Sequence, residues 1–69
     1  MKVAEYRKLR GFTQLQMASM LGIKDQSTYS KKERGQQGFN IEELLLLEEI
    51  LEASISELFS DEKRGLKNE

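Results

Sequence analysis

Apolar residues recur three or four positions apart in this chain of 69 residues, which is the spacing of one face of an α-helix. The first such segment contains Val3, Tyr6 and Leu9 and predicts a short helix over residues 2–10. Gly11 follows directly and ends the helix, because glycine favours turns over helix interiors. Three more apolar segments and one polar segment with helix start and stop signals follow, so the sequence predicts an all-α domain with five helices.

The second segment begins at a capping box. The Thr13 hydroxyl can accept a backbone N–H of the first turn, while the Gln16 side chain reaches back to the N–H of Thr13. Gly22 ends this helix, because glycine readily adopts the left-handed conformation that closes a helix. We expect Ala18 and Gly22 to be small because two helices cross closely there. The apolar positions of the segment are Leu15, Met17, Ala18 and Leu21.

A third helix is predicted almost at once. Asp25 can cap it by accepting a hydrogen bond from the backbone of Ser27 or Thr28. The polar segment 26–33 is compatible with a helix that stops at Gly35. Two short helices across a tight turn, the second rich in hydrogen-bonding side chains, are typical of a helix-turn-helix.

Asn40 and Glu43 resemble another helix cap and predict a fourth helix over residues 41–51. At about 100° per residue, most of its apolar side chains form one broad arc that should face the core. Leu46 and Ile50 point to a different side, and we expect this uncovered side to form an interface. The arc consists of Ile41, Leu44, Leu45, Leu47 and Leu51.

A last helix is predicted over residues 55–59, because Ser54 and Glu57 form a further capping box. Its apolar residues should face inward. Residues 60–69 are polar and are expected to form a disordered tail, so the folded domain should span residues 1–59. The inward-facing residues are Ile55, Leu58 and Phe59.

Charge is divided between the two halves of the chain. Residues 1–39 contain eight Lys or Arg and three acids, a net charge of +5. Residues 40–69 contain three Lys or Arg and nine acids, a net charge of −6. A polyanion can therefore approach the positive half although the whole chain has a net charge of −1.

Some classes of site are excluded by composition. The chain has no cysteine and no histidine, so it lacks disulfides, thiolate metal ligands and the commonest general base. We expect neither a cofactor nor a metal. The longest apolar run, residues 44–47, is too short to cross a bilayer, and the N-terminus lacks the apolar core of a signal peptide. A cytoplasmic location is the expectation.

Residues 13–35 resemble the helix-turn-helix of the Cro and repressor type of DNA-binding domain, once one extra residue near Lys24 is allowed in the turn. The resemblance covers about residues 3–59 and implies a lambda-repressor-like fold. Lys32 stands where the family has a large apolar residue, and Glu52 stands where it has a helix-ending glycine. The matching residues are Thr13, Gln14, Ala18, Leu21, Gly22, Ile23, Gln26, Ser27, Thr28, Tyr29, Ser30, Glu33 and Gly35.

The resemblance also implies structural roles. Arg7 pairs with Glu33, and we expect a surface ion pair, worth about 0 to 1 kcal/mol, that positions the end of the recognition helix. The stem of Lys32 should lie along apolar surface with its ammonium in solvent. Glu48 replaces an alanine of the family and should lie at the edge of the core or face a partner.

Under the same resemblance, the helix after Asp25 enters the major groove of double-stranded DNA. Glutamine can pair with adenine, lysine can donate to guanine, and serine or threonine can serve either base. Phosphates are bound by side chains around the helix, helped by free backbone amides at helix starts. The expected base contacts are Gln26, Ser27, Thr28, Ser30 and Lys31, and the expected phosphate contacts are Thr13, Gln14, Lys24, Arg34, Gln36 and Gln37.

These features favour a sequence-specific transcriptional regulator, a repressor, that binds a palindromic operator as a homodimer. The expected dimer contacts are Leu46, Ile50 and Ile55. The alternative is a protein-interaction module, such as an antitoxin or adaptor, that binds a protein partner through the same C-terminal helices. An enzyme is the weakest hypothesis, because the acids fall at helix-surface and capping positions.

Overall fold

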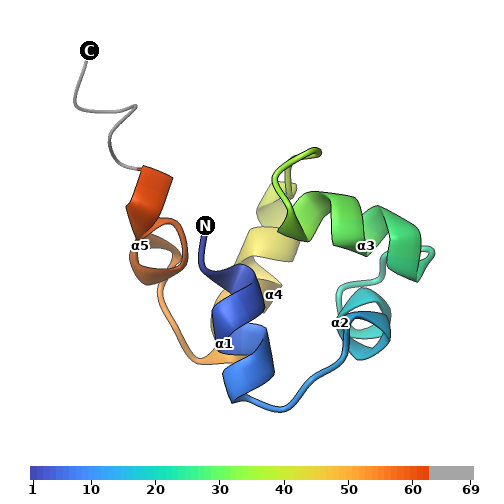
Figure 1. The fold of residues 1–69 in the computed structure, drawn as a ribbon, viewed down its shortest axis with the longest axis horizontal. Helices are drawn as coiled ribbons and strands as arrows, with labels where there is room; N and C mark the ends of the chain where they lie inside the picture. Colours follow the sequence, from blue (N-terminus) through green and yellow to red (C-terminus); the bar gives the residue numbers. More distant parts are fainter. Residues whose placement is uncertain (63–69) are drawn as a thin grey trace.

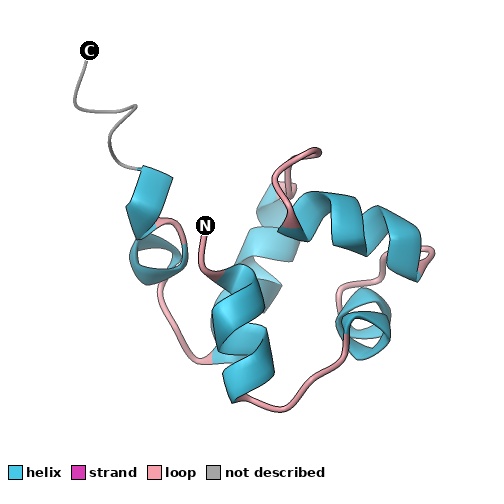
Figure 2. Cartoon of the chain, in the orientation of Figure 1, coloured by secondary structure: helices cyan, strands magenta, loops and turns pink. Residues whose placement is uncertain are grey.

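The computed structural model describes residues 1–62, which form five α-helices and contain no strand. Figure 2 shows that loops alone join the helices. The prediction of an all-α domain with five helices is confirmed. The elements are α1 (Val3–Leu9), α2 (Gln14–Met20), α3 (Gln26–Glu33), α4 (Ile41–Leu51) and α5 (Ile55–Leu58), followed by a 3-10 turn, Ser60–Glu62.

The helices are arranged around one core. In Figure 1, α2 and α3 lie at one end of the molecule and α5 at the other, with α1 and α4 between them. The second and third helices pack against each other across the turn that joins them. The buried apolar residues are Val3, Met17, Ala18, Leu21, Ile23, Tyr29, Leu47, Leu51, Ala53 and Leu58.

The three capping boxes expected from the sequence are present. At the start of α2, the Gln16 N–H donates to the Thr13 hydroxyl oxygen (3.0 Å), and the Thr13 N–H donates to the Gln16 side-chain oxygen (2.8 Å). Because each box satisfies backbone N–H groups that the helix itself leaves unpaired, it fixes where that helix begins. The same reciprocal bonds open α4, between Asn40 and Glu43, and α5, between Ser54 and Glu57.

Gly22 is needed for its backbone conformation and not for its small size. Its φ is +72°, and a Cβ built there would meet no atom within 4 Å. The expectation that Gly22 allows a close helix crossing is therefore wrong, because the left-handed backbone alone explains the residue. Ala18 is buried in the core, as the expected tight junction requires.

The fourth helix is rotated about its axis relative to the prediction. Ile41 and Leu45, expected in the core, are 71% and 58% exposed. Leu46 and Ile50, expected on an uncovered side, are half-buried and packed against the core. The rotation accompanies the burial of Glu43, which faces the body of the protein to pair with a lysine of α3. The core side of α4 consists of the buried residues Glu43, Leu47 and Leu51, flanked by the half-buried Leu44, Leu46 and Ile50.

Two glutamates end the fourth helix and connect it to the fifth. Glu52 adopts the left-handed conformation (φ 54°, ψ 47°), the geometry for which a glycine is usual. Arg10 supports this end, because its Nε donates to the Leu51 carbonyl oxygen (2.9 Å). Glu48 is half-buried and its Oε2 accepts from the Ile55 N–H (2.9 Å), so it holds the first turn of α5.

Regular structure continues past residue 59, because Ser60–Glu62 form a 3-10 turn. The remainder of the predicted tail, residues 63–69, lies outside the described residues. Leu58 is buried, as expected for the last helix, whereas Ile55 and Phe59 are half-buried.

Candidate nucleic-acid interface

The third helix attaches to the body of the protein through polar groups. Its buried residues are Tyr29, Lys32 and Glu33, which lie three and four positions apart and so share one face of the helix. This inner face carries hydroxyl, ammonium and carboxylate groups where an apolar stripe is usual. No buried side-chain nitrogen or oxygen within the part of the chain that the structure describes lacks a hydrogen-bond partner. The inner face is therefore fully paired.

Glu33 is the centre of the inner face. Its carboxylate accepts from Arg7 Nε (2.7 Å), from the Tyr29 hydroxyl (2.7 Å) and from Gln14 Nε2 (2.9 Å). The pair that the resemblance implies, Arg7 with Glu33, is thus present, but its expected place at the surface is wrong. The Glu33 side chain is only 5% exposed, because Tyr29 and α1 cover it.

The charge states follow from these contacts. Burial would raise the pKa of the Glu33 carboxyl, but hydrogen bonds from Arg7, Tyr29 and Gln14 outweigh it and hold that pKa below its usual value. Burial, together with the hydrogen bond to Glu33, raises the pKa of the Tyr29 hydroxyl. Tyr29 is therefore a neutral donor and Glu33 a charged acceptor at neutral pH.

Lys32 and Glu43 form a second buried pair. Lys32 Nζ donates to both carboxylate oxygens of Glu43, at 2.8 and 3.0 Å, and each side chain is about 10% exposed. The expectation that the Lys32 ammonium lies in solvent is wrong, because Glu43 in the first turn of α4 supplies a counter-charge. The pair takes the place of the apolar contact that the family has here, and it connects α3 directly to α4.

The opposite side of α3, which we call the outer face, consists of Gln26, Ser27, Ser30 and Lys31. Three of these residues are exposed and Ser30 is half-buried. Thr28, also expected to contact bases, is half-buried at the edge of this face. Its backbone N–H donates to Asp25 Oδ1 (2.8 Å) and caps the helix as expected.

Beside the outer face lies a shallow hollow of about 620 Å³ between the starts of α2 and α3. Gln14 and Gln26 meet there, because Gln26 Nε2 donates to Gln14 Oε1 at 3.4 Å. Gln14 also donates to Glu33, so it connects the buried carboxylate to the first residue of the outer face. The hollow is lined by Gln14, Asp25, Gln26, Ser27, Ser30 and Arg34.

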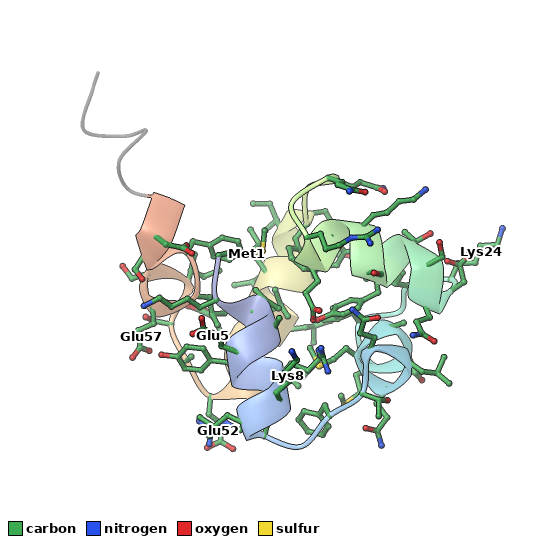
Figure 3. The ribbon with its side chains drawn as sticks, viewed as in Figure 1. Met1, Glu5, Lys8, Lys24, Glu52 and Glu57 are labelled. Carbon is green, nitrogen blue, oxygen red and sulfur yellow. The ribbon has the colours of Figure 1, made fainter. Side chains whose placement is uncertain are left out.

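The residues expected to contact phosphates occupy different places. Lys24 projects from the turn between α2 and α3, away from the body (Figure 3). Arg34 and Gln36 are exposed at the end of α3, where Arg34 Nη2 donates to Gln36 Oε1 (3.5 Å). Gln37 faces another way and lines an apolar groove near α5. The Thr13 hydroxyl serves as the cap of α2.

The extra residue in the turn does not loosen the motif. The Ile23 N–H donates to the Ala18 carbonyl oxygen (2.8 Å), and the Ile23 side chain is buried in the core. Asp25 then begins α3 with a hydrogen bond that lowers its own pKa. The longer turn is therefore anchored at both ends, and Lys24 forms its exposed tip.

A model of the helix-turn-helix family, of the Cro/C1 type, matches residues 3–58 of the chain. The chain belongs to this family. The family comprises DNA-binding regulators of transcription. No curated protein and no solved structure matches the chain.

No three His, Cys, Asp or Glu side chains in residues 1–62 come together in a way that could hold a metal ion. No helix in the same range has the length and apolar character needed to cross a bilayer.

Sequence reasoning missed the buried roles of Tyr29, Lys32 and Glu43. A signal was available for the first two, because their spacing with Glu33 places all three on one side of α3. Nothing in the sequence shows that this polar side faces inward. The inward orientation of this side becomes apparent only in the structure, where Glu43 on α4 accepts from Lys32, and Arg7 on α1 and Gln14 on α2 donate to Glu33.

Proposed function

We propose that this protein binds double-stranded DNA in a sequence-specific manner by inserting α3 into the major groove. The observation that carries the proposal is the contrast between the two faces of this helix. The inner face is fixed by buried hydrogen bonds, whereas Gln26, Ser27 and Lys31 on the outer face are exposed. A rigid helix with free donors and acceptors on one side is what base contact in the major groove requires.

Each residue of the outer face has a chemical role in this proposal. The Gln26 amide can donate to and accept from adenine, and Lys31 can donate to guanine. Ser27 and Ser30 serve either kind of base, and Thr28 contributes from the edge of the face. The Gln26 side chain also contacts α2, because its Nε2 donates to Gln14 Oε1 at 3.4 Å.

Phosphate contacts come from the residues around α3. Lys24 and Arg34 are exposed cations at the two ends of the helix, and they attract the two sugar-phosphate ridges beside the groove. Binding should weaken steeply as salt is raised, because each phosphate contact releases counterions. The remaining candidates for phosphate contact are Thr13, Gln14, Gln36 and Gln37.

The proposal includes a homodimer formed through α4 and α5. Of the expected contacts, Ile55 lines an open apolar groove of about 470 Å³, whereas Leu46 and Ile50 do not. The groove also contains Phe39, Leu44 and Phe59. None of its lining side chains is charged, and the Met1 ammonium pairs with Asp61 Oδ1 (2.8 Å), so two copies can meet there without strong like-charge repulsion. A two-fold dimer would place two recognition helices about 34 Å apart on a palindromic operator.

A dimer seated on an operator would act as a repressor wherever that operator overlaps a promoter. Such a regulator works in the compartment that holds the DNA, so we place it in the cytoplasm.

Selection from randomised DNA duplexes, followed by sequencing of the retained DNA, tests the proposal. The expected result is a palindromic site whose half-sites lie about one helical turn apart, bound more weakly as salt increases. Light scattering on the purified chain should give the mass of a dimer. Retention of duplexes without any shared sequence would contradict specific binding, and a monomer on and off DNA would contradict the dimer.

A further inference from the structure

The outward side of α4 carries two large apolar side chains that are more than half exposed. Ile41 and Leu45 are 71% and 58% exposed and lie one helical turn apart, so they form one continuous stripe. Single exposed apolar residues are ordinary, but adjacent ones on a helix form a surface that a partner can bury. We call Ile41 and Leu45 the α4 stripe.

Acidic groups surround the α4 stripe. Glu42 and Glu49 are exposed beside it and make no hydrogen bond or ion pair within the described residues. A hollow of about 390 Å³ next to Leu45 is also lined by Glu48 and Glu49. Residues 40–62 contain eight acids and no Lys or Arg. Glu43 pairs with Lys32 and Asp61 pairs with the N-terminal amine, but Glu42 and Glu49 have no such counter-charge in residues 1–62, so the field at this surface is negative.

Charge also distinguishes residues 40–62 from the proposed DNA-binding face. In Figure 3, Lys24 projects from one end of the molecule, while the labelled acids Glu52 and Glu57 lie on the side away from it. DNA carries one negative charge per phosphate and would be repelled by residues 40–62. The α4 stripe is thus left for a partner of another kind.

We propose that the α4 stripe binds a cationic amphipathic helix of a second protein, whose apolar face covers Ile41 and Leu45 and whose Lys or Arg side chains meet Glu42 and Glu49. An apolar centre with a charged rim is the usual composition of a helix-binding surface. A second copy of this chain fits poorly, because a two-fold contact would bring the same carboxylates against each other. This contrasts with the uncharged groove near α5, where two copies can meet.

A set of designed helical peptides of about 18 residues, long enough to form a helix, tests the proposal. The first peptide has leucines three and four positions apart and lysines elsewhere. One control peptide replaces the lysines with glutamates, and another replaces the leucines with glutamines. Binding to the full chain is followed through backbone amide shifts in NMR spectra. Only the first peptide should bind saturably, and the shifts should centre on α4.

Paired variants locate the site. Ile41→Gln with Leu45→Gln should weaken binding of the first peptide by about tenfold or more, because two side chains lose their apolar contact. Leu9→Gln is the matched control, since Leu9 is 73% exposed on α1 and lies outside the stripe. Both variants should bind selected DNA like the unmodified protein, so this result is independent of the DNA-binding proposal.

Three results would overturn the proposal. The first is equal binding of the glutamate peptide or the leucine-free peptide, and the second is an unchanged affinity in the double variant. The third is a homodimer that the double variant dissociates in light scattering, because the stripe would then belong to a second copy.

Discussion

The two faces of α3 use similar polar residues for opposite purposes. On the inner face, Tyr29, Lys32 and Glu33 are buried and every polar group has a partner. On the outer face, Gln26 and Lys31 are exposed. Exposure alone therefore separates groups that hold the helix in place from groups available to a ligand. Changes to the inner face should alter stability first, and changes to the outer face should alter DNA recognition alone.

The largest effect is expected from Glu33→Leu. This change leaves Arg7 as a buried cation and removes the acceptor of Tyr29 and Gln14. Removing one partner of a buried pair costs about 3 to 5 kcal/mol, a large part of the about 5 to 15 kcal/mol that stabilises a typical domain.

Urea denaturation followed by circular dichroism measures this loss. Glu5→Leu is the control, because Glu5 is exposed on α1, and it should change the unfolding free energy by less than about 0.5 kcal/mol. A loss below about 1 kcal/mol for Glu33→Leu would mean that the buried network is not what holds α3.

A slightly smaller loss, about 3 kcal/mol, is expected for Lys32→Met, because it leaves Glu43 as a buried charge without its cation. Adding Glu43→Gln should recover at least half of the loss, since glutamine keeps the capping position next to Asn40. A double-mutant cycle in urea gives the coupling energy between the two residues. Purely additive losses would show that the pair does not act as a unit.

Acid should weaken the inner face without any substitution. The folded-state pKa of Glu33 is lowered, so its contribution is present above the ordinary glutamate pKa of about 4.3 and is lost as pH falls through the lower folded value. Urea midpoints measured from pH 7 downward should therefore decline only below about pH 4.3. Stability that instead rises in this acid range would contradict the assignment of Glu33 as a charged acceptor.

The smallest change in stability is a gain at the end of α4. Glu52→Gly should stabilise the fold by about 0.5 to 1 kcal/mol, because relief of the left-handed strain exceeds the added entropy of the unfolded chain. Glu49→Gly in the exposed interior of α4 is the matched control and should destabilise by about 1 kcal/mol. Thermal unfolding of the two variants should thus shift in opposite directions.

Local signals in the sequence predicted α2 to α5 well, because each of these helices starts at its own cap, whereas α1 starts after Lys2 without a side-chain cap. Thr13, Asp25, Asn40 and Ser54 all cap the helices that they were expected to cap. These motifs involve neighbours within three residues, so they can be recognised in the sequence without knowledge of the rest of the fold.

Long-range contacts could not be predicted in the same way. Lys32 and Glu43 come from different helices, and Glu43 lies on the side of α4 that faces the core. The periodicity of α4 was ambiguous because leucine fills four consecutive positions, 44–47. Apolar pattern alone therefore placed Ile41 and Leu45 in the core, whereas the structure has both side chains exposed.

The most direct test of the central claim, that the outer face of α3 contacts bases, uses Gln26→Ala against the selected duplex and its single-base variants. The account predicts that discrimination falls by about 1 to 3 kcal/mol at one base position, with stability changed by less than about 0.5 kcal/mol. Lys24→Ala should weaken binding to all sequences alike, because Lys24 lies at the exposed tip of the turn and is expected to contact phosphate alone. If both variants lost affinity uniformly across the duplexes, the assignment of α3 as the base-contacting helix would be wrong.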